Sequence, residues 1–211
     1  MTETSSPANL PQSLLRGLLG GLLGAVLGHI LVTLCLHAGG ELWLKGPYGP
    51  HFFGISLYIG ALYGSIAYSL SRRKNPTLVG GLGAFLGIAL PMAILTRVAH
   101  WGMATNSPPT LAWVWAVLII HTVATWGVTL ALGAVLCPAR PVRGALLATV
   151  GSLAGYLLLN AWLWLVPSYA QGRWVPTSFI PSPVDMLTGL LIGAGIGGGI
   201  YLAARKNDVQ T

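Results

Sequence analysis

The chain has 211 residues, of which 54% are hydrophobic and only 7% are charged, with a formal net charge of +7. A soluble globular domain carries roughly 25% charged residues, so the composition argues against a soluble fold and predicts that lipid surrounds the chain. The two cysteines, Cys35 and Cys137, form no CxxC pair, which excludes a disulfide framework and a cysteine-based metal motif.

Six apolar stretches are long enough to cross a membrane, since a spanning helix needs roughly 20 mostly apolar residues. In chain order they cover residues 14–37, 52–70, 77–99, 111–136, 143–166 and 184–204. Backbone groups in hydrocarbon must be hydrogen-bonded internally, which predicts helices, and the runs are too long for barrel strands. The first stretch exceeds a signal-peptide core, so we expect it to be retained. We predict an all-α integral membrane protein with a polar tail over 1–13, one six-helix domain over 14–204 and a second tail over 205–211.

Positive charge is concentrated at one end of the predicted helices. The cations of that end are Arg16, Arg72, Arg73, Lys74, Arg140, Arg143, Arg205 and Lys206, whereas Lys45, Arg97 and Arg173 lie at the other. Because cytoplasmic loops carry the excess of Lys and Arg, this bias predicts cytoplasmic N- and C-termini. The single compact bundle with short loops makes a bacterial inner membrane the default location. The basic groups are short and scattered among the links, so no nucleic-acid partner is expected.

Glycines spaced four residues apart recur in five of the predicted helices. The pairs are Gly24 and Gly28, Gly60 and Gly64, Gly83 and Gly87, Gly151 and Gly155, and Gly193 and Gly197. Such pairs form a flat face that lets two helix backbones approach closely in lipid, so these glycines are predicted to pack helices. In the second and sixth helices the pair is followed by Tyr and Arg at the same offsets (Tyr68 and Arg72, Tyr201 and Arg205).

These matches predict three helical hairpins related by an internal repeat, with the first and third most alike. Chance matches among 29 glycines are the competing explanation. Three hairpins are also the plan of mitochondrial-type carriers, but the Pro-x-Asp/Glu-x-x-Lys/Arg signature of those carriers is absent. The six-helix plan with cytoplasmic termini resembles, in size and layout, the substrate-binding subunits of energy-coupling vitamin transporters.

Acidic residues are scarce, and their positions limit the function. The four carboxylates are Glu3, Glu41, Asp185 and Asp208, and none lies in the interior of a predicted helix. Asp185 opens the sixth stretch, where a helix-capping or helix-dipole role is expected. Cation-coupled pumps and antiporters need an intramembrane carboxylate as relay, so this class is disfavoured.

Histidines supply the candidate polar site. His29 and Thr33 share one face of the first helix, and His121 and Thr125 share one face of the fourth, because residues four apart lie one above the other. If the two faces meet, the bundle has a polar seam that opens outward. Three interpretations stay open: a neutral histidine as an interhelical hydrogen-bond donor, a pocket or pore for a small polar solute, and ligation of haem or metal by His29 and His121.

The sequence therefore predicts a membrane protein of transport type that binds or passes a small solute through the seam lined by His29, Thr33, His121 and Thr125. Nucleophile, phosphate-loop and metalloprotease motifs are absent, so we expect no enzymatic activity, no cofactor and no metal. The alternatives are a structural or accessory subunit of a larger membrane complex, and a haem- or metal-binding redox subunit. Expected partners are the lipid bilayer and either other membrane subunits or further copies of the chain.

Overall fold

The computed structural model describes residues 9–44, 49–71, 81, 83, 126–165 and 179–205, and the regular elements in this part are α-helices. They are α1 (Leu10–Leu44), α2 (Gly49–Leu70), α5 (Pro141–Leu165) and α7 (Pro183–Ala204), with a shorter helical segment at Trp126–Leu136. These match the first, second, fifth and sixth predicted stretches and the end of the fourth. The third stretch, apart from Gly81 and Gly83, and residues 111–125 lie outside the described residues.

Three of the helices are long and apolar enough to cross a membrane. The qualifying spans are Leu10–Leu34, Pro141–Leu159 and Pro183–Ala204, and the apolar segments Leu57–Leu70 and Trp126–Leu136 are shorter. The protein is therefore all-helical in its described part, and its long apolar helices indicate an integral membrane protein in contact with a lipid bilayer.

Proline marks where the described helices begin. Each of these helices has a proline in its first turn: Pro11, Pro50, Pro141 and Pro183. Backbone N–H groups in the first turn have no partner within the helix, so proline costs no hydrogen bond there, and its fixed φ suits a helix. At its other end α1 runs to Leu44, beyond the predicted end at residue 37, even though it contains two consecutive glycines. Glycine lowers helix propensity, but these glycines do not end the helix.

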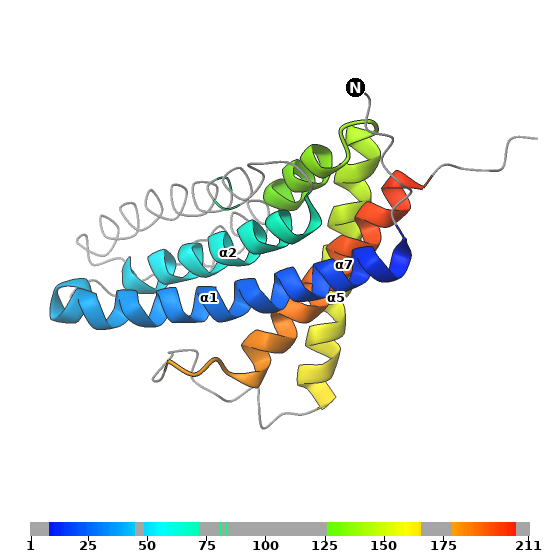
Figure 1. The fold of residues 1–211 in the computed structure, drawn as a ribbon. Helices are drawn as coiled ribbons and strands as arrows, with labels where there is room; N and C mark the ends of the chain where they lie inside the picture. The colour runs from blue at the N-terminus through cyan, green and yellow to red at the C-terminus, as the bar shows by residue number, and fades with distance from the viewer. Residues whose placement is uncertain are drawn as a thin grey trace, which may run out of the picture.

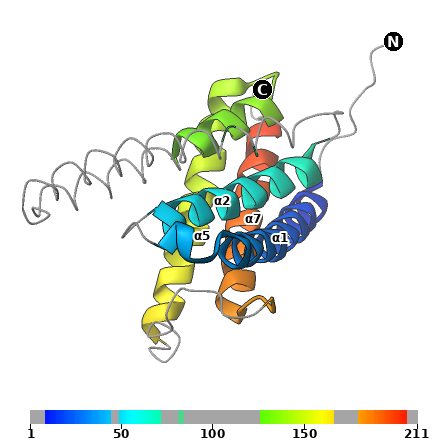
Figure 2. The same ribbon diagram turned by 90° about the vertical axis from the view of Figure 1, so that its left-hand side faces the viewer.

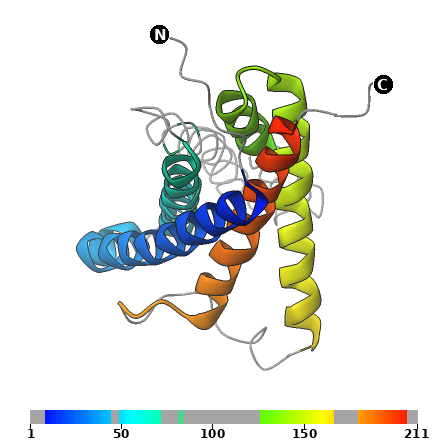
Figure 3. The same cartoon turned by 45° about the vertical axis from the view of Figure 1, so that its right-hand side comes forward.

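The helices pack in the order α2, α1, α7 and α5, with α1 and α7 in the middle. α1 contacts both α2 and α7, and α7 in turn contacts α5. Figure 1 shows α1 beside α2, and Figure 2, which looks along α1, shows α5 and α7 running across it. In Figure 3 α5 and α7 run side by side. The segment Trp126–Leu136 packs on α5, where Gly133 and Gly144 meet backbone to backbone.

Glycines make the contact between α1 and α7 close. A Cβ on Gly17 would overlap the carbonyl of Gly193, and one on Gly21 would overlap the carbonyl of Gly189. Gly197 lies in the same way against the Ser13 carbonyl. The two backbones touch along this line because no side chain holds them apart, which is how helices associate in lipid.

The α1–α2 and α5–α7 pairs use the same register. The predicted repeat equates Gly24 and Gly28 of α1 with Gly151 and Gly155 of α5, and Gly60 and Gly64 of α2 with Gly193 and Gly197 of α7. Under that correspondence the residue contacts of one pair are the residue contacts of the other: Gly24 with Leu62 and Gly28 with Tyr58, and Gly151 with Gly195 and Gly155 with Leu191. The sequence offsets and the helix contacts agree.

The second hairpin is only partly described. Gly81 faces α2, where a Cβ would lie 3.2 Å from the Gly60 carbonyl oxygen and 3.6 Å from the Gly64 Cα. A Cβ on Gly83 would meet nothing within 4 Å, so packing by this predicted glycine is not seen in the described part of the chain. Gly87 lies outside the described residues.

Candidate functional site

A stripe of small residues on α1 leads directly to the predicted polar residues. Ser13, Gly17, Gly21 and Ala25 follow one another at intervals of four and face α7, and His29 is the next residue of the series. On α7 the opposing series runs the other way, through Gly197, Gly193 and Gly189 to Asp185. The close contact between α1 and α7 therefore ends in a histidine on one helix and a carboxylate on the other.

Asp185 is held in place by the start of α7. Ser182 is the N-cap residue, and its hydroxyl accepts a hydrogen bond from the Asp185 backbone N–H at 3.1 Å. In return the Asp185 carboxylate accepts from the Ser182 backbone N–H at 3.2 Å and from its hydroxyl at 2.8 Å. This reciprocal arrangement is a capping box, with Asp185 at the third helical position. A carboxylate there also opposes the positive end of the helix dipole.

The same carboxylate oxygen reaches across to α1. His29 Nδ1 lies 2.9 Å from Asp185 Oδ2, and the two side chains are only 8% and 14% exposed. Bonding through Nδ1 orients the imidazole ring of His29. The pair brings an ionisable group of a membrane-spanning helix into contact with a charged partner.

A third helix meets the pair through Tyr58 of α2. The Tyr58 hydroxyl donates to the Asp185 carbonyl over 3.4 Å. The ring fits here because it lies against Gly28, where a Cβ would be 2.8 Å from the Tyr58 Cδ2. The start of α7 is thus joined to α1 and α2 around His29 and Asp185, on the side of the membrane that the sequence predicts to be the outer one. We define these two residues with Tyr58 and Ser182 as the outer polar cluster.

The other polar residues of the α1 face bond within their own helix. The Thr33 hydroxyl donates to the His29 carbonyl at 2.9 Å, and His37 Nδ1 donates to the Thr33 carbonyl at 2.8 Å. Because a carbonyl oxygen only accepts, Nδ1 is the protonated nitrogen of His37. The His37 ring also lies 5.3 Å from that of Phe179, in the segment that leads into α7. Thr33 and His37 continue the polar stripe of α1 from His29 toward the C-terminal end of the helix.

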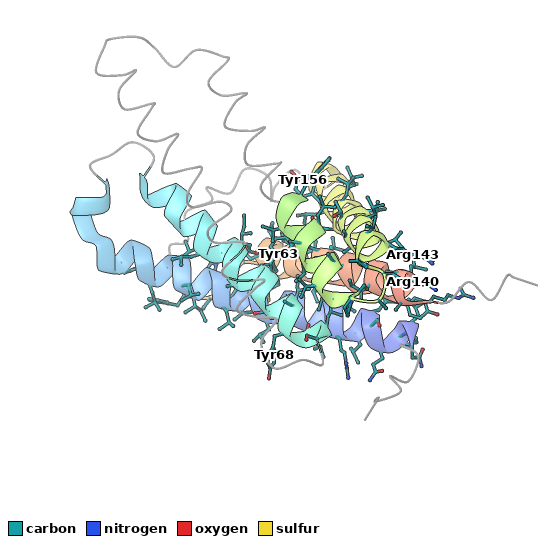
Figure 4. All side chains as sticks on the ribbon, turned by 90° about the horizontal axis from the view of Figure 1, so that it is seen from above. Tyr63, Tyr68, Arg140, Arg143 and Tyr156 are labelled. Carbon is teal, nitrogen blue, oxygen red and sulfur yellow. The ribbon has the colours of Figure 1, made fainter. Side chains whose placement is uncertain are left out.

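A second polar group lies inward of the outer cluster. Tyr63 of α2, 2% exposed, is hydrogen-bonded to Ser152 of α5, and Thr149 of α5 donates to the Thr129 hydroxyl at 3.3 Å. Figure 4 shows Tyr63 in the interior of the bundle, whereas Tyr68 on the same helix points outward. Tyr63 follows Tyr58 by five residues, or roughly 7.5 Å along the helix. We call these four hydroxyl-bearing residues the inner polar layer.

The structure brings together only part of the predicted seam. His29 and Thr33 share one buried face of α1, at 7% and 0% exposure. His121 and Thr125 lie outside the described residues, and so does any contact between the two predicted faces. Among the described residues no group of three or more His, Cys, Asp or Glu is arranged to hold a metal.

Sequence reasoning missed the partner of His29. Asp185 was expected only to cap or complement α7, which it does as part of the capping box, but the same side chain also binds His29. The signal was present as small residues at intervals of four, which lead to Asp185 on one helix and to His29 on the other. Predicting the pair from this signal requires knowing that α1 packs against α7, because His29 and Asp185 are 156 positions apart in the sequence.

No known protein family, characterised protein or solved structure matches this chain. The function is therefore argued from the geometry of the chain itself.

Proposed function

We propose that this protein is a six-span membrane protein of transport type, in which the outer polar cluster binds a small polar solute at the outward end of a seam between helices. The observation that carries the proposal is the His29–Asp185 contact, which joins the first and last described helices. Ionisable residues inside a membrane protein are costly and are retained mostly where they line a substrate, ion or proton path.

The position of the pair relative to the repeat supports this function. His29 belongs to the first predicted hairpin and Asp185 to the third, and the matching contact registers of α1–α2 and α5–α7 favour a common origin for these hairpins. Many transporters are built from internal repeats and bind their substrate where the repeats meet, often beside a helix N-terminus. The start of α7 supplies such a terminus at this site.

The inner polar layer indicates where the seam would continue from the outer polar cluster through the bundle. Hydroxyl groups suit a path for a small polar solute because each can donate and accept hydrogen bonds. Tyr63, Ser152 and Thr129 are buried in a part of the chain otherwise lined by apolar side chains. A solute bound at the outer cluster would meet these hydroxyls next on its way through the bundle.

The proposed orientation follows from charge. Arg16, Arg140, Arg143 and Arg205 lie near the inner ends of α1, α5 and α7 as the sequence predicts them, and the cytoplasmic side of a membrane protein is the one enriched in Lys and Arg. In this orientation both termini are cytoplasmic, the outer polar cluster faces away from the cytoplasm, and the membrane is a bacterial inner membrane.

Reconstitution tests the proposal. The full chain in liposomes would be assayed for uptake of small neutral and anionic solutes: polyols, amino acids and monocarboxylates. At least one solute should enter faster than into empty liposomes, and His29→Ala or Asp185→Asn should lower that flux by about tenfold, the effect of losing roughly 1.4 kcal/mol of interaction. Leu27→Ala is the matched control, because Leu27 lies near His29 on α1 but is 42% exposed.

The accessory-subunit alternative rests on a different surface. α1 exposes leucines at intervals of four, a face that either lipid or a neighbouring subunit can cover: Leu15, Leu19, Leu23, Leu27 and Leu31. Mass spectrometry of the gently purified protein decides between the transport and accessory functions. Stoichiometric partner chains, together with no solute flux in liposomes, would establish an accessory role instead of transport. A Soret band lost in His29→Ala would instead establish the redox-subunit alternative.

A further inference from the structure

The contacts between the predicted hairpins repeat, as the contacts within them do. In each case a glycine of one hairpin lies against two residues spaced four apart on another: Gly17 against Gly193 and Gly197, Gly81 against Gly60 and Gly64, and Gly144 against Gly133 and Cys137. The predicted repeat equates the partners of Gly17 with the partners of Gly81. Through these three contacts each hairpin touches the other two, so the hairpins form a closed ring.

Tyr63 crosses the interior of this ring. Its helix, α2, is separated from α5 by α1 and α7 in the packing order, so α2 and α5 lie on opposite sides. The Tyr63 side chain is nevertheless hydrogen-bonded to Ser152 of α5, and it is the largest fully buried side chain in the described part of the chain. Ile196 of α7, which the repeat equates with Tyr63, is also fully buried. Equivalent positions of two helices therefore face the interior, and Tyr63 reaches across it (Figure 4).

Polar groups lie on both sides of Tyr63 along the bundle. Tyr58, which donates to the Asp185 carbonyl in the outer polar cluster, precedes Tyr63 by five residues on α2. On the other side, Thr149 lies three residues before Ser152 on α5 and donates to the Thr129 hydroxyl. An aromatic ring between two polar groups closes any path that joins them. The bond to Ser152 holds the ring in this position.

We infer that Tyr63 is the gate of the seam and that its hydrogen bond to Ser152 keeps the gate closed, an inference that rests on the proposed transport function. Rotation of the tyrosine about its χ1 angle opens the path and breaks the bond, which leaves both hydroxyls without this partner in an apolar interior. A solute with hydroxyl groups can donate to one and accept from the other. Such a solute replaces the lost bond, so the gate favours polyols over apolar solutes of the same size.

Stopped-flow light scattering of proteoliposomes in a glycerol gradient tests the gate. Tyr63→Phe keeps the ring and removes the hydroxyl, and Ser152→Ala removes its partner. Each should raise glycerol permeability about two- to tenfold, the change that the net contribution of one hydrogen bond produces in an opening equilibrium. Both variants break the same bond, so the double variant should be no more permeable than either single one. Tyr68→Phe is the matched control: it removes the same hydroxyl from a tyrosine of α2 that is 67% exposed, and it should change nothing.

The other results would overturn the gate. A lower permeability in Tyr63→Phe would mean that the hydroxyl assists passage, and wild-type permeability in both single variants would mean that the bond closes no path. Additive increases in the double variant would also contradict a shared bond. If Tyr63→Phe does not fold, Ser152→Ala still reports on the bond.

The proposed function fails separately from the gate. Solute uptake by the wild type that neither variant changes would remove the gate and leave transport in place. Glycerol passage in both variants, with no uptake of any solute by the wild type, would support a closed gate and contradict the proposed transport. No passage in any of the chains would overturn both.

Discussion

Replacing Gly193 by alanine tests the packing that brings the site together. A methyl group at this position would overlap the carbonyl of Gly17 on α1 and lie 3.0 Å from the Gly21 Cα. Both obstacles are backbone atoms, which cannot rotate aside as a side chain can. The helices must therefore separate, and separation also loosens the neighbouring contacts of Gly189 with Gly21.

The cost follows from overpacking. Forcing an extra methyl into a packed interior costs typically about 1–3 kcal/mol, and the backbone contact places Gly193→Ala toward the upper end. For a chain of this length each kcal/mol lowers the unfolding midpoint by roughly 2–4 °C. We expect Gly193→Ala to unfold about 4–12 °C below the wild type in differential scanning fluorimetry of the detergent-solubilised protein.

Gly198 provides the control within the same helix. A Cβ there would have Leu14 Cδ2 as its nearest neighbour, at 3.5 Å, which is ordinary van der Waals contact. Alanine has the higher helix propensity, so Gly198→Ala should leave the midpoint unchanged or raise it slightly. Equal midpoints for Gly193→Ala and Gly198→Ala would refute the close contact between α1 and α7.

Three further predictions concern the outer cluster and the link before α5. Ser182→Ala removes the α7 cap and should cost about 1 kcal/mol in unfolding free energy, whereas Ser182→Asn should retain most of it; equal losses would refute the capping role. In a double-mutant cycle by chemical denaturation, His29→Ala and Asp185→Asn should show a coupling of roughly 0.5–2 kcal/mol, and additive effects would contradict the contact. Burial raises the pKa of the Cys137 thiol, so in a Cys35→Ser background maleimide should label Cys137 slowly near neutral pH and ~tenfold faster per pH unit above it; a rate independent of pH would contradict the burial.

The helices could be predicted from the sequence because lipid imposes a simple requirement. A long apolar run must be helical, and a proline near its start fixes where the helix begins, so the predicted start of α7 lies one residue from the observed one at Pro183 and its end is the same, Ala204. Helix α1 extends several residues beyond the predicted spanning stretch, to Leu44. Gly39 and Gly40 lower helix propensity there without ending the helix.

The polar face of α1 could also be predicted from the sequence, because His29 and Thr33 are spaced so that they lie on the same side of a helix. The partner of that face was not, because tertiary packing decides which helix lies opposite. Asp185 has a sufficient local role in the capping box, and that role hid its second contact. Small residues recur at intervals of four and lead to Asp185 on α7 and to His29 on α1. The two series, considered together, predict the pair.

Cysteine accessibility is the measurement that tests the outward-facing seam most directly. In a background of Cys35→Ser and Cys137→Ser, His29→Cys and Leu27→Cys would be exposed from outside intact cells to a small, charged, membrane-impermeant thiosulfonate. His29 lies in the outer polar cluster and is 7% exposed, whereas Leu27 lies on the exposed apolar face of α1 and is 42% exposed. Thiol modification needs a thiolate, and therefore water. A solute-binding seam predicts labelling of His29→Cys and none of Leu27→Cys, whereas a lack of labelling at position 29 would mean that the cluster only holds the helices together.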